Sequence, residues 1–270
     1  MNGLADVAGV TLAVVRRDAR LFVSYRLRFV TQLLTALFTL TLFYYLSRLV
    51  NVRSFAGPDQ YFGFAVVGLV IVQVLNSSIA LPPVNLRQEL VAGTFERWVA
   101  SPAGAPVVSV ATLVFPFLLS VLTALIMLGL GSLLFGLNVQ WVTVPLVIPA
   151  SVLGFLAFAP FGVLVMAVVI VAKQALGATT FIVAGMSLVA GLYFPVSLLP
   201  GWIRWASEVQ PFTPAVELMR FALLGRPLEH SVWADLAQLA LFPAILFPVS
   251  IFALRGALAA GLRRGTIFEY

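Results

Sequence analysis

Long apolar stretches alternate with short polar ones along the whole chain. A helix that crosses a membrane takes about 20 apolar residues, and six stretches approach or exceed that length. They comprise residues 29–47, 61–81, 107–137, 141–172, 176–194 and 233–254. The pattern predicts an all-α integral membrane protein with six transmembrane helices, forming a single transmembrane domain over residues 1–270. Because two of the stretches are longer than one crossing needs, we expect tilt, interfacial extensions, or kinks at Pro116 and Pro160.

The composition agrees with a membrane protein. Hydrophobic residues make up 61% of the chain and charged residues 10%, against about 45–50% and about 25% in soluble domains. The formal net charge is +6, but the basic residues are not clustered with interleaved aromatic residues as in a nucleic-acid-binding module. We therefore interpret them as the excess of arginine that cytoplasmic loops carry, and we expect no nucleic-acid partner.

The first 28 residues have the pattern of an amphipathic helix rather than of a span. Apolar residues recur at helical spacing at Leu4, Val7, Val10 and Val14. The polar side carries Arg16, Arg17 and Arg20. Residues 1–28 are thus predicted to form a helix in the cytoplasmic interface, with its arginines toward membrane lipid headgroups. A cleavable signal peptide is the alternative, but the charged region is long and the apolar run after Arg28 is too long for a signal core.

A polar island at residues 84–102, VNLRQELVAGTFERWVASP, separates the second and third apolar stretches. Pro82 and Pro83 precede it and Pro102 closes it, and proline disfavours a continuous helix. Read as a helix, the island gathers its apolar residues on one face, namely Val91, Phe95, Trp98 and Val99. We predict a short amphipathic helix that faces the cytoplasm and docks a soluble partner.

A second irregular segment, residues 195–231, lies between the last two stretches. Four prolines exclude one continuous helix there, at Pro195, Pro200, Pro211 and Pro214. Tryptophan prefers the headgroup level of a membrane, and Trp202 and Trp205 lie in this segment. We predict two short helices, near 202–209 and 214–224, that dip partly into the outer leaflet.

The distribution of basic residues predicts the orientation. With six spans and both termini cytoplasmic, eleven basic residues are inside: Arg16, Arg17, Arg20, Arg26, Arg28, Arg87, Arg97, Lys173, Arg255, Arg263 and Arg264. Five are outside: Arg48, Arg53, Arg204, Arg220 and Arg226. This bias follows the positive-inside rule and makes residues 255–270 a cytoplasmic tail.

Two motifs resemble those of one family, the ABC type-2 exporter permeases. In the island, Arg87, Glu89, the run Gly93-Thr94-Phe95-Glu96 and Ser101-Pro102 are similar to the "RE…GT-x-E…SP" segment of that family. In residues 191–225 the family pattern "G-x-x-FP…LP-x-W…P-x-T…E-x-x-R" is matched by Gly191, Phe194-Pro195, Leu199-Pro200, Trp202, Pro211, Thr213, Glu217 and Arg220. The resemblance extends over nearly the whole chain.

The resemblance implies roles for particular residues. In the family the island is the coupling helix that sits in a groove of the ATPase subunit, which implicates Arg87, Glu89, Gly93, Thr94, Phe95, Glu96, Arg97, Trp98 and Pro102. The outer segment implies a gate formed by Phe194, Pro195, Pro200, Trp202, Glu217 and Arg220. The first, second and fifth spans line the path in this family, which suggests Phe38, Tyr44, Tyr45, Phe181 and Tyr193 as path residues.

The resemblance also implies an assembly and a class of cargo. Two permease copies, identical or closely related, would combine with two ATPase subunits in the bacterial cytoplasmic membrane. The family moves amphipathic drugs, lipids, glycolipids and lipid-linked polysaccharides. The chain lacks the G-x-x-x-x-G-K-[ST] phosphate-binding loop, so ATP and Mg would bind the partner ATPase and this chain would hold no cofactor.

Other interpretations remain open at this stage. An ion-coupled secondary transporter would need no ATPase, but the spans hold no ionisable residue near their middles. An intramembrane transferase needs a nucleophile or base, and the chain has no cysteine and only His230 as a histidine, which leaves no metal or catalytic set.

Glu217 and Arg220 are three residues apart and would also suit a local ion pair. Phe95 and Trp98 would pack either on the membrane interface or on the ATPase.

Overall fold

The computed structural model describes residues 3–49, 55, 57–140, 142–172, 176–192, 196, 199–228 and 231–264. These residues form helices and connecting turns and contain no strand, so the prediction of an all-helical protein is confirmed. The elements are α1 (Gly3–Ser24), α2 (Arg26–Leu49), α3 (Pro58–Leu75), η1 (Asn76–Ala80), α4 (Leu81–Val91), α5 (Glu96–Val99), α6 (Gly104–Ala111), α7 (Val114–Phe135), η2 (Val144–Leu146), α8 (Val147–Ala172), α9 (Leu176–Val189), α10 (Gly201–Val209), α11 (Phe212–Leu224) and α12 (Val232–Arg264).

Five helical runs in the described residues are long and apolar enough to cross a membrane. They are Phe29–Leu49, Pro58–Val91, Gly104–Phe135, Val144–Ala172 and Val232–Arg263. The predicted span 176–194 corresponds to α9, whose 14 residues are fewer than the about 20 that one crossing takes. Residues 193–195 lie outside the described residues, and the count of six spans stays a prediction.

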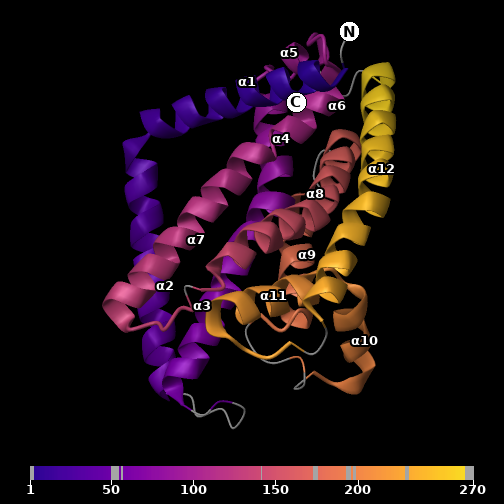
Figure 1. Ribbon diagram of the computed structural model, residues 1–270. Coiled ribbons are helices and arrows are strands. Elements are labelled where there is room, and N and C mark those ends of the chain that lie inside the picture. Colours follow the sequence, from indigo (N-terminus) through magenta and orange to yellow (C-terminus); the bar gives the residue numbers. More distant parts are fainter. Residues whose placement is uncertain are drawn as a thin grey trace.

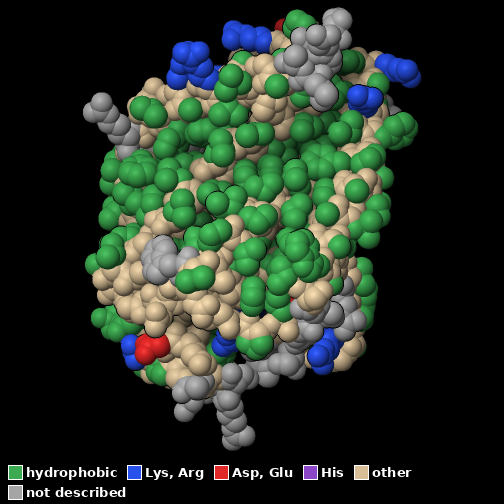
Figure 2. Space-filling view, viewed as in Figure 1, with side chains coloured by type: hydrophobic (Ala, Val, Ile, Leu, Met, Phe, Trp, Pro, Cys, Tyr) green, Lys and Arg blue, Asp and Glu red, His purple; other side chains and the backbone are tan. Residues whose placement is uncertain are grey.

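The long helices run between two ends of the molecule (Figure 1). One end carries α1, α4, α5, α6 and the last turns of α12, and we call it the α5 end; the opposite end carries α10 and α11, and we call it the α11 end. Between them, hydrophobic side chains form a broad band, and the visible Lys and Arg side chains lie at the two ends (Figure 2). Such a band is the surface that a bilayer core requires.

The second span continues through the predicted stop at Pro82 and Pro83. Elements α3, η1 and α4 form one helical run, Pro58–Val91, that ends within the polar island. The two prolines occupy the first turn of α4, directly after the π-helical turn Asn76–Ala80. Within a continuous run, proline is tolerated where a local π-helical adjustment changes the hydrogen-bond pattern, and this turn lies directly before Pro82. The prediction that the prolines end the span at residue 81 was therefore wrong.

Two further boundaries differ from the predictions. Helix α1 ends at Ser24, and α2 already begins at Arg26. The third stretch is divided into α6 and α7 at Thr112 and Leu113, shortly before Pro116. Pro160 lies inside the continuous helix α8.

The last helix, α12, continues to Arg264, so the predicted tail 255–270 is helical over residues 255–264. Leu254, Ala257 and Leu258 are buried, and their spacing of three and four residues places them on one face. This apolar face continues past the predicted end of the span and packs on the rest of the chain. The packing explains why the helix does not stop at Arg255.

Glycine allows two backbones to meet inside the band. A Cβ added at Gly162 of α8 would lie 2.1 Å from the carbonyl oxygen of Ser78 in η1. A Cβ at Gly68 of α3 would lie 2.3 Å from the carbonyl oxygen of Leu192. Small residues at such crossings let helices in a membrane approach closely. The π-helical turn is thus held directly against α8.

We expect Gly162→Ala to destabilise the protein by about 1–3 kcal/mol or more, because the new methyl group overlaps the Ser78 carbonyl and η1 must move. Gly129→Ala in α7 is the matched control, since a Cβ there meets nothing within 4 Å and alanine favours a helix. Thermal unfolding of the purified variants in the same detergent measures the difference. Equal unfolding temperatures would contradict the close contact.

Candidate functional site

The polar island forms two helices joined by a turn, so the single amphipathic helix predicted over residues 84–102 was wrong. Helix α4 ends at Val91, and α5 is one turn, Glu96–Val99. Gly93 has φ of 67°, in the left-handed region that favours glycine. Its amide donates to the Leu90 carbonyl at 3.1 Å. Glycine in this conformation just after a helix is a common C-terminal stop.

Glu89 holds the turn between α4 and α5 together. Its carbonyl oxygen accepts the amide of Thr94 at 3.0 Å and that of Phe95 at 3.2 Å. Its carboxylate accepts a hydrogen bond from the Thr94 hydroxyl. The same carboxylate forms an ion pair with Arg17 of α1, with 3.2 Å between Nη1 and Oε1. Glu89 therefore connects the turn to the N-terminal helix, a link that residue spacing did not indicate.

Arg17 has a second acidic neighbour. Its Nε donates to Oδ1 of Asp18 at 2.8 Å. Burial raises the pKa of the Asp18 carboxyl above its usual value, and Arg17 opposes that rise. Arg17 itself is 41% exposed. One partly exposed guanidinium thus bridges Asp18 on its own helix and Glu89 on the island.

Phe95 and Trp98 are buried within the chain, with exposed fractions of 1% and 4%. Their rings lie 5.4 Å apart. We expected a membrane interface or an ATPase groove to cover them, and that expectation was wrong, since the chain's own core does so. The aromatic pair anchors the turn and α5 rather than facing a partner.

The implicated island residues fall into three groups by exposure. Arg87, Glu89 and Thr94 are half-buried, while Phe95 and Trp98 are buried. Gly93, Glu96, Arg97 and Pro102 are exposed. Together with the exposed apolar residues Val91 and Val99, these make what we call the tip surface: Val91, Gly93, Glu96, Arg97, Val99 and Pro102. It combines apolar and charged groups at the α5 end, as a partner-binding surface does.

The segment 195–231 contains the two short helices that were predicted there. Helix α10 covers Gly201–Val209 and α11 covers Phe212–Leu224, with Pro214 near the start of α11. Pro200 and Trp202 are exposed. Phe194 and Pro195 lie outside the described residues.

Arg220 of α11 is buried, with 8% exposure. Its Nη2 donates to the carbonyl oxygens of Gly191 at 2.9 Å and Leu192 at 3.2 Å. Its guanidinium carbon lies 3.4 Å from the ring centroid of Phe64 in α3. Arg220 therefore joins α11 to the turn after α9 and to α3. These contacts between distant segments go beyond the local ion pair that its spacing from Glu217 suggested; Glu217 is half-buried on the same helix.

The suggested path residues that the structure describes differ in their surroundings. Phe38 and Tyr45 of α2 and Phe181 of α9 are exposed. Tyr44 packs on Phe135, with 5.1 Å between the rings. Tyr193 lies outside the described residues. A path lined by these side chains would need a surface from another subunit, and this assignment stays a prediction.

The fold is that of a multi-pass membrane protein, and comparison with known proteins agrees. Residues 11–224 match the model of the ABC-2 type transporter family. The chain belongs to this family, and the resemblance seen in the sequence is confirmed. Members of this family are membrane-spanning transporter subunits, which are generally non-catalytic and associate with an ABC ATPase subunit.

One relative is Nodulation protein J of Rhizobium meliloti (strain 1021). It is 28% identical over 116 residues, which cover 43% of this chain and 44% of that protein. The match thus spans less than half of either protein.

We expect Trp98→Ala to lower the free energy of unfolding by about 3–5 kcal/mol, because it leaves a cavity beside Phe95. Arg97→Ala, one position earlier and exposed, should change it by less than about 0.5 kcal/mol. Denaturant unfolding in mixed micelles, followed by far-ultraviolet circular dichroism, compares the two. If both variants unfolded alike, Trp98 would not be anchored in the chain.

Replacing Arg220 by methionine should destabilise the α11 end by at least about 2 kcal/mol, because the Gly191 and Leu192 carbonyls lose a charged donor. Arg220→Lys should recover only part of this loss, since lysine lacks the planar fork that contacts both carbonyls and stacks on Phe64. Arg204→Met, at an exposed position in α10, is the control. Limited proteolysis between α9 and α11 measures the opening, and equal cleavage of all three variants would refute this role.

Proposed function

We propose that the protein is the permease subunit of an ATP-driven exporter. It moves an amphipathic drug, lipid, glycolipid or lipid-linked polysaccharide across the bacterial cytoplasmic membrane. A separate ATPase subunit binds ATP and Mg and supplies the energy. Membership of the ABC-2 type transporter family supports the transport role. The observation that carries the coupling role is the tip surface at the end of a helical run long enough to cross the membrane.

The run Pro58–Val91 gives the proposal a mechanical basis. At the α11 end, Phe64 of this run stacks under Arg220. At the α5 end, Glu89 of the same run holds the turn that presents the tip surface. Long helices bend sharply only at identifiable breaks, so the parts of the run on either side of such a break move as units. ATPase closure at the tip surface thus displaces the segment that packs against the outer helices.

The π-helical turn Asn76–Ala80 divides this run into two parts. Such turns are rare and occur frequently at functional sites, since one extra residue in the turn widens and loosens it. Ser77 in this turn also donates to the Ser120 hydroxyl of α7 at 3.2 Å. We take the turn as the point where the inner part, α4, pivots against α3 while α8 holds the turn in place.

The assembly we propose has two permeases, identical or closely related, and two ATPase subunits. Helices α2 and α12 flank the molecule in Figure 1 and expose stripes of large apolar side chains. Phe38 and Tyr45 lie on the α2 stripe. A second permease facing this stripe would enclose the path between the two copies. Both termini would then be cytoplasmic, because α1 and the last described turn of α12 lie at the α5 end (Figure 1).

Charge reversal on the tip surface tests the proposal. We expect Glu96→Arg and Arg97→Glu each to weaken binding of the ATPase subunit at least tenfold, about 1.4 kcal/mol, while unfolding stays normal because both positions are exposed. The measurements are co-purification and cargo-stimulated ATP hydrolysis in lipid vesicles.

Arg204→Glu, exposed on α10 at the opposite end, is the matched control and should change nothing. Normal binding and export by both tip variants would show that another surface receives the ATPase. Export driven by a proton or sodium gradient without any ATPase would replace the proposal with an ion-coupled transporter.

A further inference from the structure

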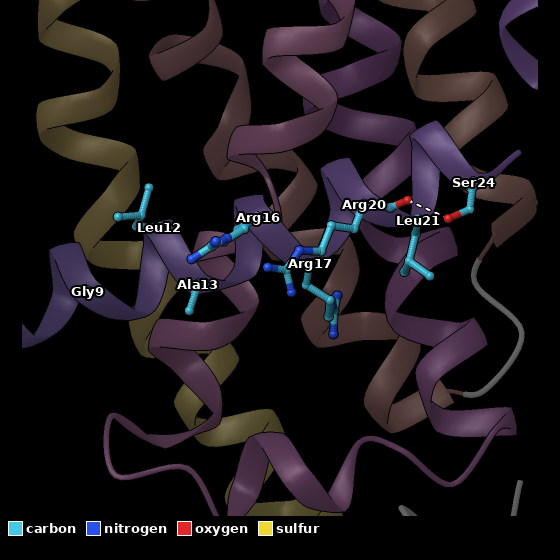
Figure 3. A pocket seen from close by; sticks show the side chains of 8 residues that line it. All are labelled: Gly9, Leu12, Ala13, Arg16, Arg17, Arg20, Leu21 and Ser24. Carbon is cyan, nitrogen blue, oxygen red and sulfur yellow. Dashed lines mark hydrogen bonds between the residues drawn. The ribbon is translucent and has the colours of Figure 1, made fainter. Parts of the chain in front are cut away.

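Helix α1 carries a groove that neither the family nor the tip surface explains. Its volume is about 600 Å³, and its walls come from Gly9, Leu12, Ala13, Arg16, Arg17, Arg20, Leu21 and Ser24. Figure 3 shows the three arginine side chains between Leu12 at one end and Leu21 at the other. All of these residues belong to α1, so the groove is an open face of one helix and not an enclosed small-molecule cavity.

The groove concentrates positive charge. Arg16 and Arg20 are exposed, and within the described part of the chain only Arg17 of the three has an ion pair. Asp18 is not among the lining residues. A guanidinium presents its donors in a planar fork that matches phosphate oxygens. The polar part of the groove is thus complementary to a phosphate group.

The apolar part of the groove and its place in the fold specify the ligand further. Leu12 and Leu21 are large, exposed apolar residues of α1, and Val14 on its other side is buried against the chain. Figure 1 shows α1 lying across the α5 end, nearly perpendicular to α2, at the level where the hydrophobic band of Figure 2 stops. A ligand there has its charge in the headgroup layer and its chains in the bilayer.

We propose that this groove binds the phosphate headgroup of an anionic phospholipid from the inner leaflet. Arg16 and Arg20 hold the phosphate, and the leucines contact the upper parts of the acyl chains. Binding also draws on Arg17, because its guanidinium lines the groove and simultaneously holds Glu89. Lipid occupancy therefore competes with Glu89 for Arg17 and loosens the turn that presents the tip surface.

The proposed lipid binding depends on the groove alone, whereas the proposed effect on ATP hydrolysis rests on the proposed function. The link through Arg17 is suited to exchange, since the pair with Glu89 is partly exposed and such pairs are weak. The first measurement is therefore made on the permease without any ATPase.

The binding test uses the purified full chain in neutral detergent, titrated with short-chain phosphatidylglycerol, with short-chain phosphatidylcholine and with inorganic phosphate. The readout is tryptophan fluorescence together with the lipid retained in native mass spectra. We expect phosphatidylglycerol to bind at least tenfold more tightly than phosphatidylcholine, and inorganic phosphate to bind weakly because it gains nothing from the apolar walls.

Arg16→Gln combined with Arg20→Gln should remove this preference, and Arg16→Lys combined with Arg20→Lys should keep most of it. Arg204→Gln at the α11 end is the control for general charge and should leave it intact. Equal binding of both lipids by the unchanged chain would overturn the site. Equal binding of inorganic phosphate would show an anion site that does not recognise lipid, and would overturn the assignment to phospholipid.

The second measurement uses the exporter with its ATPase in phosphatidylcholine vesicles with and without phosphatidylglycerol. We expect phosphatidylglycerol to change the rate of ATP hydrolysis severalfold, and Arg17→Gln to give a rate that no longer depends on this lipid. A lipid effect that persisted in Arg17→Gln would overturn the link to Glu89 while leaving the binding site in place. Loss of ATPase association in the unchanged exporter would instead count against the proposed function.

Discussion

A hydrocarbon layer offers no partner for a backbone amide or carbonyl, so each must be satisfied within the chain. This constraint decides where irregular structure occurs in the protein. The left-handed turn at Gly93 lies at the α5 end, and the proline-rich connections around α10 lie at the α11 end. The longest irregular connections therefore lie at the two ends, and the band between them consists mainly of helices that connect one end to the other.

Close helix packing makes that connection effective. The contact of Gly162 with the Ser78 carbonyl fixes the π-helical turn against α8, and such small-residue contacts replace the hydrophobic driving force that lipid does not supply. The turn is held at its side while α4 and α3 extend from it in opposite directions. In the proposed coupling, this arrangement turns a displacement at the tip surface into a pivot of α4 against α3.

The sequence predicted the features that depend on composition and spacing. Five of the apolar stretches became long helices, and the four prolines of residues 195–231 correctly indicated two short ones. The prolines at 82 and 83 were misread, because the π-helical turn before them lets the helix continue, and that turn has no sequence signal of its own. Periodicity also identified Phe95 and Trp98 as one apolar face without saying what covers that face.

The contacts of Arg17 with Glu89 and of Arg220 with two carbonyls join segments far apart in the chain, and no local sequence pattern encodes them.

These two arginines show how burial separates a fixed contact from an exchangeable one. Arg220 is buried, and its guanidinium donates to two backbone carbonyls, so the contact is costly to break and keeps α11 in place. Arg17 is 41% exposed, and its pair with Glu89 is screened by water and ions. A pair of this kind contributes at most about 1 kcal/mol, so the anionic lipid proposed to bind at α1 needs little energy to displace Glu89 from Arg17. Burial thus makes the contact at the α11 end hard to break, and exposure leaves the one at the α5 end open to exchange.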